Sequence, residues 1–284
     1  MAVLNIAALS RRTGVAPDTL RKWEHRYGVL QPQRTPGGQR RYTELDVSRV
    51  EWLRDRLEEG YRIGEAAMLL GDAPLTGRRT AAELRDALVA AVSESDLRAV
   101  EALLDQAFAI HRLEHTLTRV VQPALELVGK AWAAGKLTIA QEHLITGAVR
   151  ARMERLLADM RGGVRGVAVL ECVPGERHEL GLMSIGLLLR ADGWQVAYLG
   201  ADAPLRDVFD LAEQLRAPLV GLSVGTADNA KALRAEVARR RLPSGPEVVV
   251  GGAAATVRLA RALGARPAGD DVRRTVRELR RVAR

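Results

Sequence analysis

The residues best suited to chemistry lie in one short loop, where Glu176 precedes His178 by two positions and Gly181 follows it by three. Imidazole is a fitting axial ligand for a transition metal such as cobalt. Glu176 can accept the proton of the second ring nitrogen and so fix the orientation and basicity of the ring. Gly181 would let the following helix begin close to a ligand. The same short pattern also fits an ordinary surface histidine, so the loop alone leaves both interpretations open.

A second set of residues suits contacts with a polyanion. A short helix, a tight turn at Gly14 and a second helix that begins at Pro17 form a helix-turn-helix pattern. The stretch 34–42 then places a glycine pair between cations, which is typical of a wing lying on phosphates. The alternative is a basic, solvated surface on a small helical domain. The residues that we expect to contact DNA are Arg11, Arg21, Lys22, His25, Arg34, Arg40, Arg41 and Tyr42.

Three blocks of sequence must position these residues. Residues 1–75 hold the winged helix-turn-helix. Residues 80–162 repeat apolar side chains at helical spacing and predict a four-helix bundle. Residues 163–284 alternate β-branched runs with helical patterns, which predicts a Rossmann-like, flavodoxin-like parallel sheet with helices on both faces. The loop with His178 follows the first strand of that sheet, and ligands bind at the carboxyl ends of such strands.

Composition and charge narrow the function classes. The net charge is +8, and residues 1–42 hold eight Arg or Lys against two Asp or Glu, so the basic surface is concentrated where the first motif lies. One cysteine, Cys172, excludes a disulfide framework and a multi-cysteine metal site. We see no signal peptide and no apolar run of the ~18 residues that span a bilayer, so we expect a cytoplasmic protein with no membrane partner.

The first block closely resembles the MerR-type DNA-binding domain. The segments 20–28 and 34–42 carry this resemblance, which implies double-stranded operator DNA as a partner. Many relatives of this type continue into a long dimerisation helix. Here Gly60, Gly64, Gly71 and Pro74 interrupt the chain. Self-association must therefore come from the later blocks.

The third block resembles the cobalamin-binding module of methionine synthase and the mutases. Their pattern is Asp-x-His-x-x-Gly, then Ser-x-Leu, then Gly-Gly. The resemblance implies His178 as the lower cobalt ligand and Glu176 as the residue that orients it. It further implies a path for the displaced cofactor tail along Ser223, Gly251 and Gly252. Two departures are visible, because Glu176 stands in place of Asp and Gly225 in place of Leu.

Nine residues separate Trp132 from the adjacent pair Glu142 and His143. Trp132 could be plain bundle core and the pair a polar helix surface. However, the spacing resembles the CarH-type, light-responsive regulators that use adenosylcobalamin, and with the MerR-type start the resemblance covers essentially the whole chain. In that family the Trp and Glu pack against the adenosyl group and the His lies close by. A DNA-binding repressor, not an enzyme, is implied.

The resemblance also implies a switch. Adenosylcobalamin between bundle and sheet would hold the chains together as a homotetramer in the dark, whose several DNA-binding blocks raise avidity. Light would break the cobalt–carbon bond and release the DNA. Some relatives carry a His directly after the Trp, which can take the upper cobalt position after illumination. This chain has Ala133 there, which leaves His143 or water, with His111 and His115 as poorer candidates.

Two other functions remain open at the level of sequence. A methyl-carrying corrinoid protein would share the helical cap and the corrinoid module, with methylcobalamin as its cofactor. The chain has no domain the size of a methyl-donor barrel, and a DNA-binding block is fused to it. A MerR-type regulator that works without cobalamin is the other alternative, and an intact His178 argues against it.

Overall fold

A computed structural model of the chain describes all residues except 1–3, 31, 36, 59–60, 71–78, 161, 240–244, 270–271 and 280–284. It divides into two compact units, Met1–Val128 and Gly129–Arg284, which are described in turn. The boundary that the sequence predicts at residue 75 lies outside the described residues.

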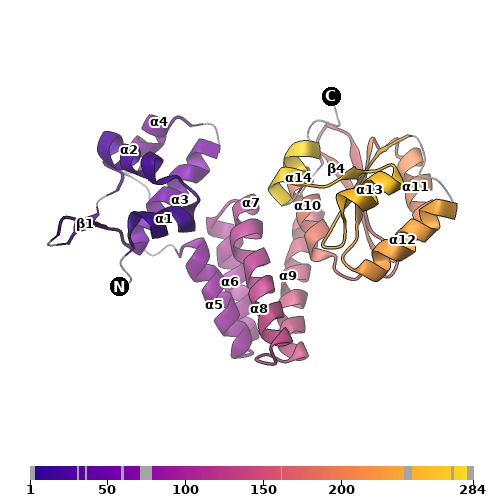
Figure 1. Cartoon of the computed structure of the whole chain (residues 1–284), viewed down its shortest axis with the longest axis horizontal. Helices are drawn as coiled ribbons and strands as arrows, with labels where there is room; N and C mark the ends of the chain where they lie inside the picture. The colour runs from indigo at the N-terminus through magenta and orange to yellow at the C-terminus, as the bar shows by residue number, and fades with distance from the viewer. Residues whose placement is uncertain are drawn as a thin grey trace. The chain divides into compact units, whose positions relative to one another are not determined.

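The first unit begins with the helix-turn-helix. Asn5 caps α1 (Ile6–Thr13) through its side chain, and Gly14 ends the helix in the left-handed conformation. The second helix, α2, spans Pro17–Tyr27 and starts with proline at its first turn, where no amide donor is needed. Two short antiparallel strands follow, β1 (Gln33–Arg34) and β2 (Arg40–Arg41). They form the expected wing, which Figure 1 shows projecting from the helices.

Two further helices, α3 (Glu44–Glu58) and α4 (Ile63–Leu70), close the small core of this region. The arginine fork of Arg12 on α1 binds the carboxylate of Glu44 on α3 at 2.5 and 2.7 Å. Such a bidentate pair fixes the angle between the two helices. The apolar centre of this region consists of buried side chains, among them Leu9, Leu20, Trp23, Tyr42, Val47, Val50 and Leu53.

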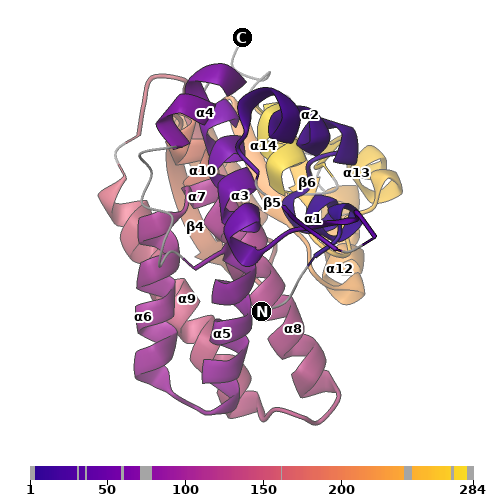
Figure 2. The same cartoon turned by 90° about the vertical axis from the view of Figure 1, so that its left-hand side faces the viewer.

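The helical block of the first unit starts at Thr80, which forms a capping box with Glu83 at the head of α5 (Ala81–Ser93). Asp96 caps α6 (Leu97–Ile110), and α5 and α6 lie side by side (Figure 2). A short helix α7 (Leu113–His115), a π-helical segment (Thr116–Val121) and α8 (Gln122–Ala133) run on as one rod. These helices fall within residues 80–162, for which the sequence predicts a bundle of four helices, and they correspond to the first three.

The second unit holds the fourth helix, α9 (Ile139–Asp159), which Thr138 and Gln141 cap reciprocally. The strands are β3 (Val167–Cys172), β4 (Gln195–Ala201), β5 (Leu219–Ser223), β6 (Glu247–Gly251) and β7 (Arg266–Pro267). All pair in parallel, in the order β4-β3-β5-β6-β7. This is the flavodoxin-like order of a doubly wound sheet, so the predicted fold class is confirmed.

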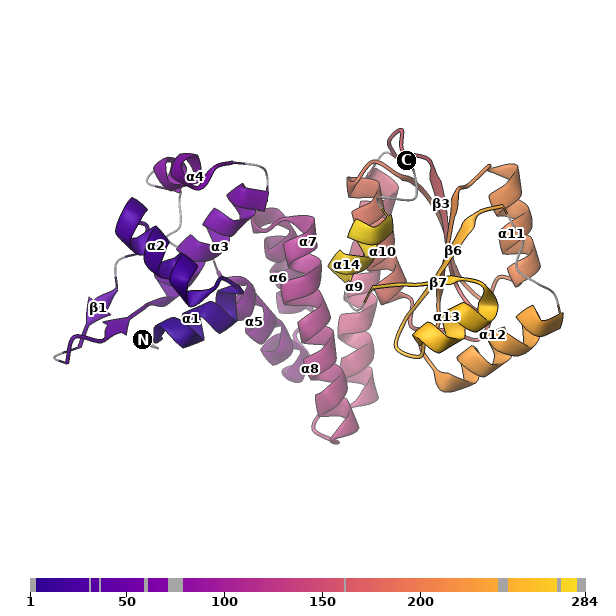
Figure 3. The same cartoon turned by 45° about the horizontal axis from the view of Figure 1, so that its top comes forward.

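Helices cover both faces of the sheet (Figure 3). The connections α11 (Leu205–Gln214), α12 (Ala227–Arg239) and α13 (Val257–Leu263) lie on one face. They bury a core of valine, leucine and alanine against the strands. The helices α10 (Leu180–Ala191) and α14 (Val272–Leu279) lie on the other face. The strand order reverses at β3, because β4 is added on one side of β3 and β5 on the other, and ligands bind at such a switch point.

Candidate functional site

The predicted lower-ligand loop leaves the sheet at this switch point. The carboxyl ends of β3 and β5 are in register, with Cys172 opposite Ser223. The backbone amide of Val173 donates to the carbonyl of Ser223 at 3.0 Å, which extends the pairing past the strand ends. The loop after β3 carries Glu176 and His178, and the loop after β5 carries Gly225 and leads into α12. The topology therefore brings two of the three predicted motifs together.

Glu176 is the fixed centre of this loop. Its side chain is completely buried. Oε1 accepts from the backbone amide of His178 at 2.8 Å and lies 2.6 Å from the ring Nδ1 of the same residue. Oε2 accepts from the side-chain amide of Asn229 at 2.9 Å and from the backbone amide of Gly225. Burial alone would raise the pKa of Glu176, but these four hydrogen bonds outweigh it and lower the pKa to about 2.

The ring of His178 is held at one nitrogen only. An ionised carboxylate can only accept a hydrogen bond, so Nδ1 of the ring is the donor, and in the neutral imidazole Nε2 is then the atom with a free lone pair. The side chain of His178 is 78% exposed, in contrast to its buried partner. A neutral imidazole with an oriented, accessible Nε2 is what a lower axial ligand requires. The donor set of this chain therefore fits a cobalt ion above the loop.

The three glycines predicted near the cofactor, Gly181, Gly251 and Gly252, differ in the space around them. Gly252 has φ of +109°, and a Cβ there would lie 2.4 Å from the carbonyl oxygen of Val224, so the chain itself requires glycine. A Cβ at Gly251 would lie 2.9 Å from Cβ of Ala268. A Cβ at Gly181, in the first turn of α10, would meet nothing within 4 Å. Space therefore stays open above Gly181 in the protein alone.

The predicted upper residues lie at the end of α8 and the start of α9. Trp132 is 47% exposed, so it is not a closed core residue of the described structure. The cap at Thr138 places Glu142 and His143 in the first turn and a half of α9. Oε2 of Glu142 lies 2.9 Å from Nδ1 of His143, and its Oε1 accepts from the hydroxyl of Thr146 at 2.7 Å. The carboxylate again orients a neighbouring, largely exposed imidazole.

The predicted DNA-contacting residues occupy one region of the first unit. Arg21, Lys22 and His25 are exposed on α2, while Leu20 and Trp23 on the same helix are buried. Arg11 is exposed near the end of α1, and Arg34 is exposed on the wing. The burial of Leu20 and Trp23 agrees with the inner face that their spacing predicts for a recognition helix. The same spacing predicts an inward Tyr27, and this is wrong, because Tyr27 at the last position of α2 is 37% exposed.

Two of the predicted residues hold the wing in place. Arg40 binds the carboxylate of Glu24 through Nε, at 2.9 and 3.1 Å from its two oxygens. The ring of Tyr42 is fully buried, and its hydroxyl donates to Oε2 of Glu24 at 3.1 Å. Burial and this carboxylate raise the pKa of Tyr42 to about 12. Arg41, between them, is half-buried and lies 3.2 Å from Gln39.

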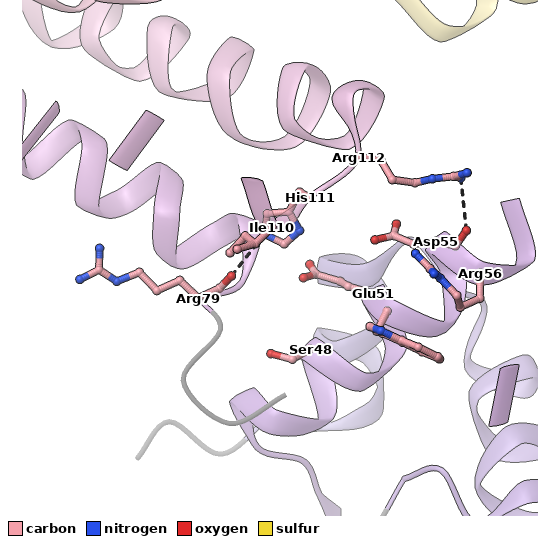
Figure 4. Close-up of a pocket in the computed structure, with 9 residues that line it drawn as sticks. Ser48, Glu51, Asp55, Arg56, Arg79, Ile110, His111 and Arg112 are labelled. Carbon is pink, nitrogen blue, oxygen red and sulfur yellow. Dashed lines mark hydrogen bonds between the residues drawn. The ribbon is translucent and has the colours of Figure 1, made fainter. Parts of the chain in front are cut away.

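Sequence reasoning missed a charged cavity of about 70 Å³ in the first unit (Figure 4). Glu51 and Asp55 on α3 reach toward His111 and Arg112 at the end of α6. Glu51 is nearly fully buried, and this burial raises its pKa to about 7. The available signal was the excess of acids over bases in residues 43–72. Within the described part of the chain no cluster of His, Cys, Asp and Glu could hold a metal ion.

Comparisons with known proteins match all three blocks. Residues 4–72 match the model of the MerR HTH family regulatory protein. Residues 84–157 and residues 166–282 each match a model described as a B12 binding domain. Among the residues that the structure describes, every helix is too short or too polar to pass through a lipid bilayer.

Relatives share most of this arrangement. The chain is 38% identical to the HTH-type transcriptional repressor CarH of Myxococcus xanthus, over 89% of each chain. It is 32% identical to the HTH-type transcriptional repressor CarA of the same organism, over 78% of this chain and 76% of CarA. Dimethylamine corrinoid protein 3 of Methanosarcina acetivorans is 29% identical over 64% of this chain. The monomethylamine corrinoid protein of Methanosarcina barkeri superposes with a TM-score of 0.60 over 70% of this chain and 98% of its own, at 19% identity, which shows a shared fold.

Proposed function

Because this chain belongs to the CarH-type, B12-binding regulators of the MerR family, we propose that it is a transcriptional repressor controlled by adenosylcobalamin and light. The observation that carries the proposal is the pair Glu176 and His178. A buried, ionised carboxylate fixes Nδ1 of an exposed imidazole at the switch point of the sheet, and leaves Nε2 to bind cobalt.

The residues of the second unit would hold the cofactor from two sides. His178 is the lower ligand, with Glu176 as its orienting partner. The cofactor tail would lie along Ser223, Gly251 and Gly252, and Gly181 leaves room beside it. Trp132, Glu142 and His143 would cover the adenosyl group. When bound, adenosylcobalamin supplies a cobalt–carbon bond that visible light can break.

The protein would convert occupancy of this site into DNA binding by changing its assembly. With the adenosyl group under Trp132, we propose that the chain associates into a homotetramer in the dark. Several winged helix-turn-helix blocks in one assembly raise avidity through effective concentration. Loss of the adenosyl group would remove the contacts that hold Trp132 and Glu142 in place. The protomers would then associate more weakly, and the affinity for DNA would fall. Occupancy by cofactor and by DNA must be coupled reciprocally.

Within each protomer, residues 1–75 would read DNA, residues 80–162 would cap the corrin and residues 163–284 would bind it. The contacts to phosphates and bases would come from Arg11, Arg21, Lys22, His25, Arg34, Arg40 and Arg41. Tyr42, which the sequence predicts as a DNA contact, is fully buried and instead holds the wing through Glu24 together with Arg40. Limited proteolysis tests this division: cuts are expected near residues 75 and 162. A cut inside 84–157 that leaves the rest intact would argue against it.

The decisive experiment is size-exclusion chromatography with adenosylcobalamin, in the dark and after green light, with a DNA mobility shift on the same fractions. We expect a large assembly that retains DNA in the dark and a smaller species that releases it in light. His178→Ala should take up the cofactor weakly, with a changed absorbance spectrum. Unchanged affinity, spectrum and assembly in His178→Ala would overturn the proposal.

A methyl-carrier function is the second candidate, because dimethylamine corrinoid proteins cover 64% of this chain. Such a protein would accept methyl groups on the cofactor and would use methylcobalamin. A methyl-transfer assay run beside the mobility shift separates the two. Methyl transfer together with DNA retention that ignores light would favour the carrier.

A further inference from the structure

Gly225, two residues after the end of β5, lies directly against the carboxylate of Glu176. A Cβ atom at position 225 would be 2.5 Å from Oε2, 2.8 Å from Cδ and 3.0 Å from Oε1 of Glu176. Non-bonded heavy atoms pack best at ~3.5–4.0 Å, so no side chain fits here while Glu176 keeps its position. The backbone amide of Gly225 also donates to Oε2. Position 225 is therefore the floor of the carboxylate site.

The backbone at Gly225 does not itself ask for glycine. Its φ is not among the positive values of the chain, unlike those of Gly175 and Gly252. The φ at this position therefore does not exclude a residue with a side chain. The need for glycine is thus a need for space, and the group that uses the space is the carboxylate of Glu176.

The two oxygens of Glu176 have separate tasks. Oε2 accepts from the backbone amide of Gly225 and from the side-chain amide of Asn229 at the start of α12. The backbone amide of Asn229 in turn donates to the hydroxyl oxygen of Thr226 at 3.2 Å. Oε1 binds the amide and the Nδ1 of His178. Relieving a contact of 2.5 Å requires a movement of about 1 Å. Because the carboxylate is buried and held on both sides, that movement must break the anchor and turn the imidazole.

We propose that Gly225 is a positioning residue for His178, and that Glu176 and Gly225 are matched in size. Glu is one methylene longer than Asp, and Gly225 provides the room for that extra length. An apolar side chain at position 225 would then require Asp at position 176. The inference deepens the proposed function, since it concerns how the cobalt ligand is aimed, but the position of His178 can be tested without any cofactor.

The test compares Gly225→Ala, Glu176→Asp and the double variant, with Gly245→Ala as the matched control. Gly245 is exposed ahead of β6, and a Cβ there would meet nothing within 4 Å. In the protein without cofactor, the ring nitrogens of His178 are followed by ¹H–¹⁵N NMR. With cobalamin, absorbance gives the affinity, and electron paramagnetic resonance of the Co(II) form reports nitrogen ligation.

Gly225→Ala is expected to lose the hydrogen-bonded Nδ1–H signal of His178 and at least tenfold in cobalamin affinity. The double variant should recover most of both, while Gly245→Ala keeps the native values. A native NMR signal in Gly225→Ala, or a double variant no better than Gly225→Ala, would overturn the inference. If the native chain binds no cobalamin, the proposed function fails, but the NMR comparison still decides about Gly225.

If Gly225→Ala fails to fold, it is compared with the double variant Glu176→Ala with Gly225→Ala. This pair removes the carboxylate that a Cβ at position 225 would strike. A folded double variant beside an unfolded Gly225→Ala, judged by circular dichroism, supports the clash. Equal unfolding of both would contradict it.

Discussion

Arg40 on the wing strand β2 and Glu24 on the recognition helix α2 form an ion pair, with Nε 2.9 Å from Oε1. The carboxylate is mostly buried and also receives the hydroxyl of Tyr42. Two elements that must meet DNA together are thus joined through one side chain. This pair ties the wing to α2, beside the backbone bridge between Leu4 and Tyr42 at the base of the wing.

Glu24→Gln is expected to lower the free energy of unfolding by about 1–3 kcal/mol, because the guanidinium loses its charged partner and an amide NH2 replaces one of the two acceptor oxygens. Urea unfolding followed by tryptophan fluorescence measures this. The control is Asp18→Asn, which removes the same charge from α2 but breaks the exposed pair with Arg21, at a cost of about 0.5 kcal/mol or less. Equal losses in the two variants would contradict a special role for Glu24.

Lys22→Ala tests the DNA-contacting face of α2. Removing one phosphate contact should weaken binding to any duplex about equally and reduce the slope of log affinity against log salt by about 1. Arg98→Ala removes the same charge from an exposed position on α6 and should leave the slope unchanged. Identical slopes for Lys22→Ala and the native protein would place the DNA elsewhere.

Glu51 makes the stability of the first unit depend on pH. Burial raises its pKa to about 7, while Arg54, Arg12 and the backbone amide of Ala81 oppose the rise and Asp55 adds to it. The folded state therefore binds a proton that the unfolded state releases near pH 4.5, the usual value for Glu. Stability from this group is full below that pH and is lost as the pH rises through 7.

Glu51→Gln should remove this dependence. The native protein is expected to lose, relative to the variant, on the order of 3 kcal/mol between pH 4.5 and pH 8, from the shift of the pKa. Urea unfolding of both proteins at several pH values measures the difference. Parallel stability curves over this range would show that Glu51 does not titrate as described.

Two glycines of the corrinoid module should respond in opposite ways to alanine. Gly252→Ala is expected to destabilise the protein without cofactor by more than about 1 kcal/mol, since both its φ and its contact with Val224 exclude a side chain. Gly181→Ala should leave that stability unchanged or slightly raised, as a helical position gains from alanine. Its effect should be on cobalamin affinity. Unaltered cobalamin binding in Gly181→Ala would remove Gly181 from the site.

The residue at position 133 should determine which group binds the upper face of cobalt after illumination. Ala133→His should add a nitrogen signal above the cobalt in the Co(II) or Co(III) spectrum, since Ala133 follows Trp132 on the exposed end of α8. In the native chain, a second nitrogen that disappears in His143→Ala assigns the upper ligand to His143. If neither the native protein nor His143→Ala shows a second nitrogen, the upper ligand is water. If Ala133→His gives the same spectrum as the native protein, position 133 does not lie above the cobalt.

The sequence was sufficient for features with local causes. The cap at Asn5, the glycine turn at Gly14 and the alternation of strands with helices follow from side-chain chemistry close in sequence. The capping boxes at Thr80 and Thr138 are equally local, but they became visible only in the structure. The order of the strands and the pair of His178 with Glu176 follow from the resemblance to a known module. Family membership and fold class are both confirmed.

Contacts between distant elements were beyond sequence reasoning. The sequence around Glu24 does not indicate that its carboxylate accepts hydrogen bonds from Arg40 and Tyr42, which are 16 and 18 residues away. From the sequence, Gly225 in place of Leu indicates only a small change in packing. The structure shows that the backbone of Gly225 lies against the carboxylate of Glu176. Asn229, a residue that no motif singled out, anchors the same carboxylate. Each of these depends on the three-dimensional approach of loops, for which local spacing carries no signal.

Cys172 has a practical consequence. It is the single cysteine of the sequence, fully buried on β3, and burial together with Glu171 and Glu176 raises its pKa to about 12. A thiol that stays protonated and out of reach reacts slowly with maleimides. New cysteines on the wing and on α9 can therefore be labelled with fluorophores in the otherwise native chain, and energy transfer between them can test the proposed switch in real time.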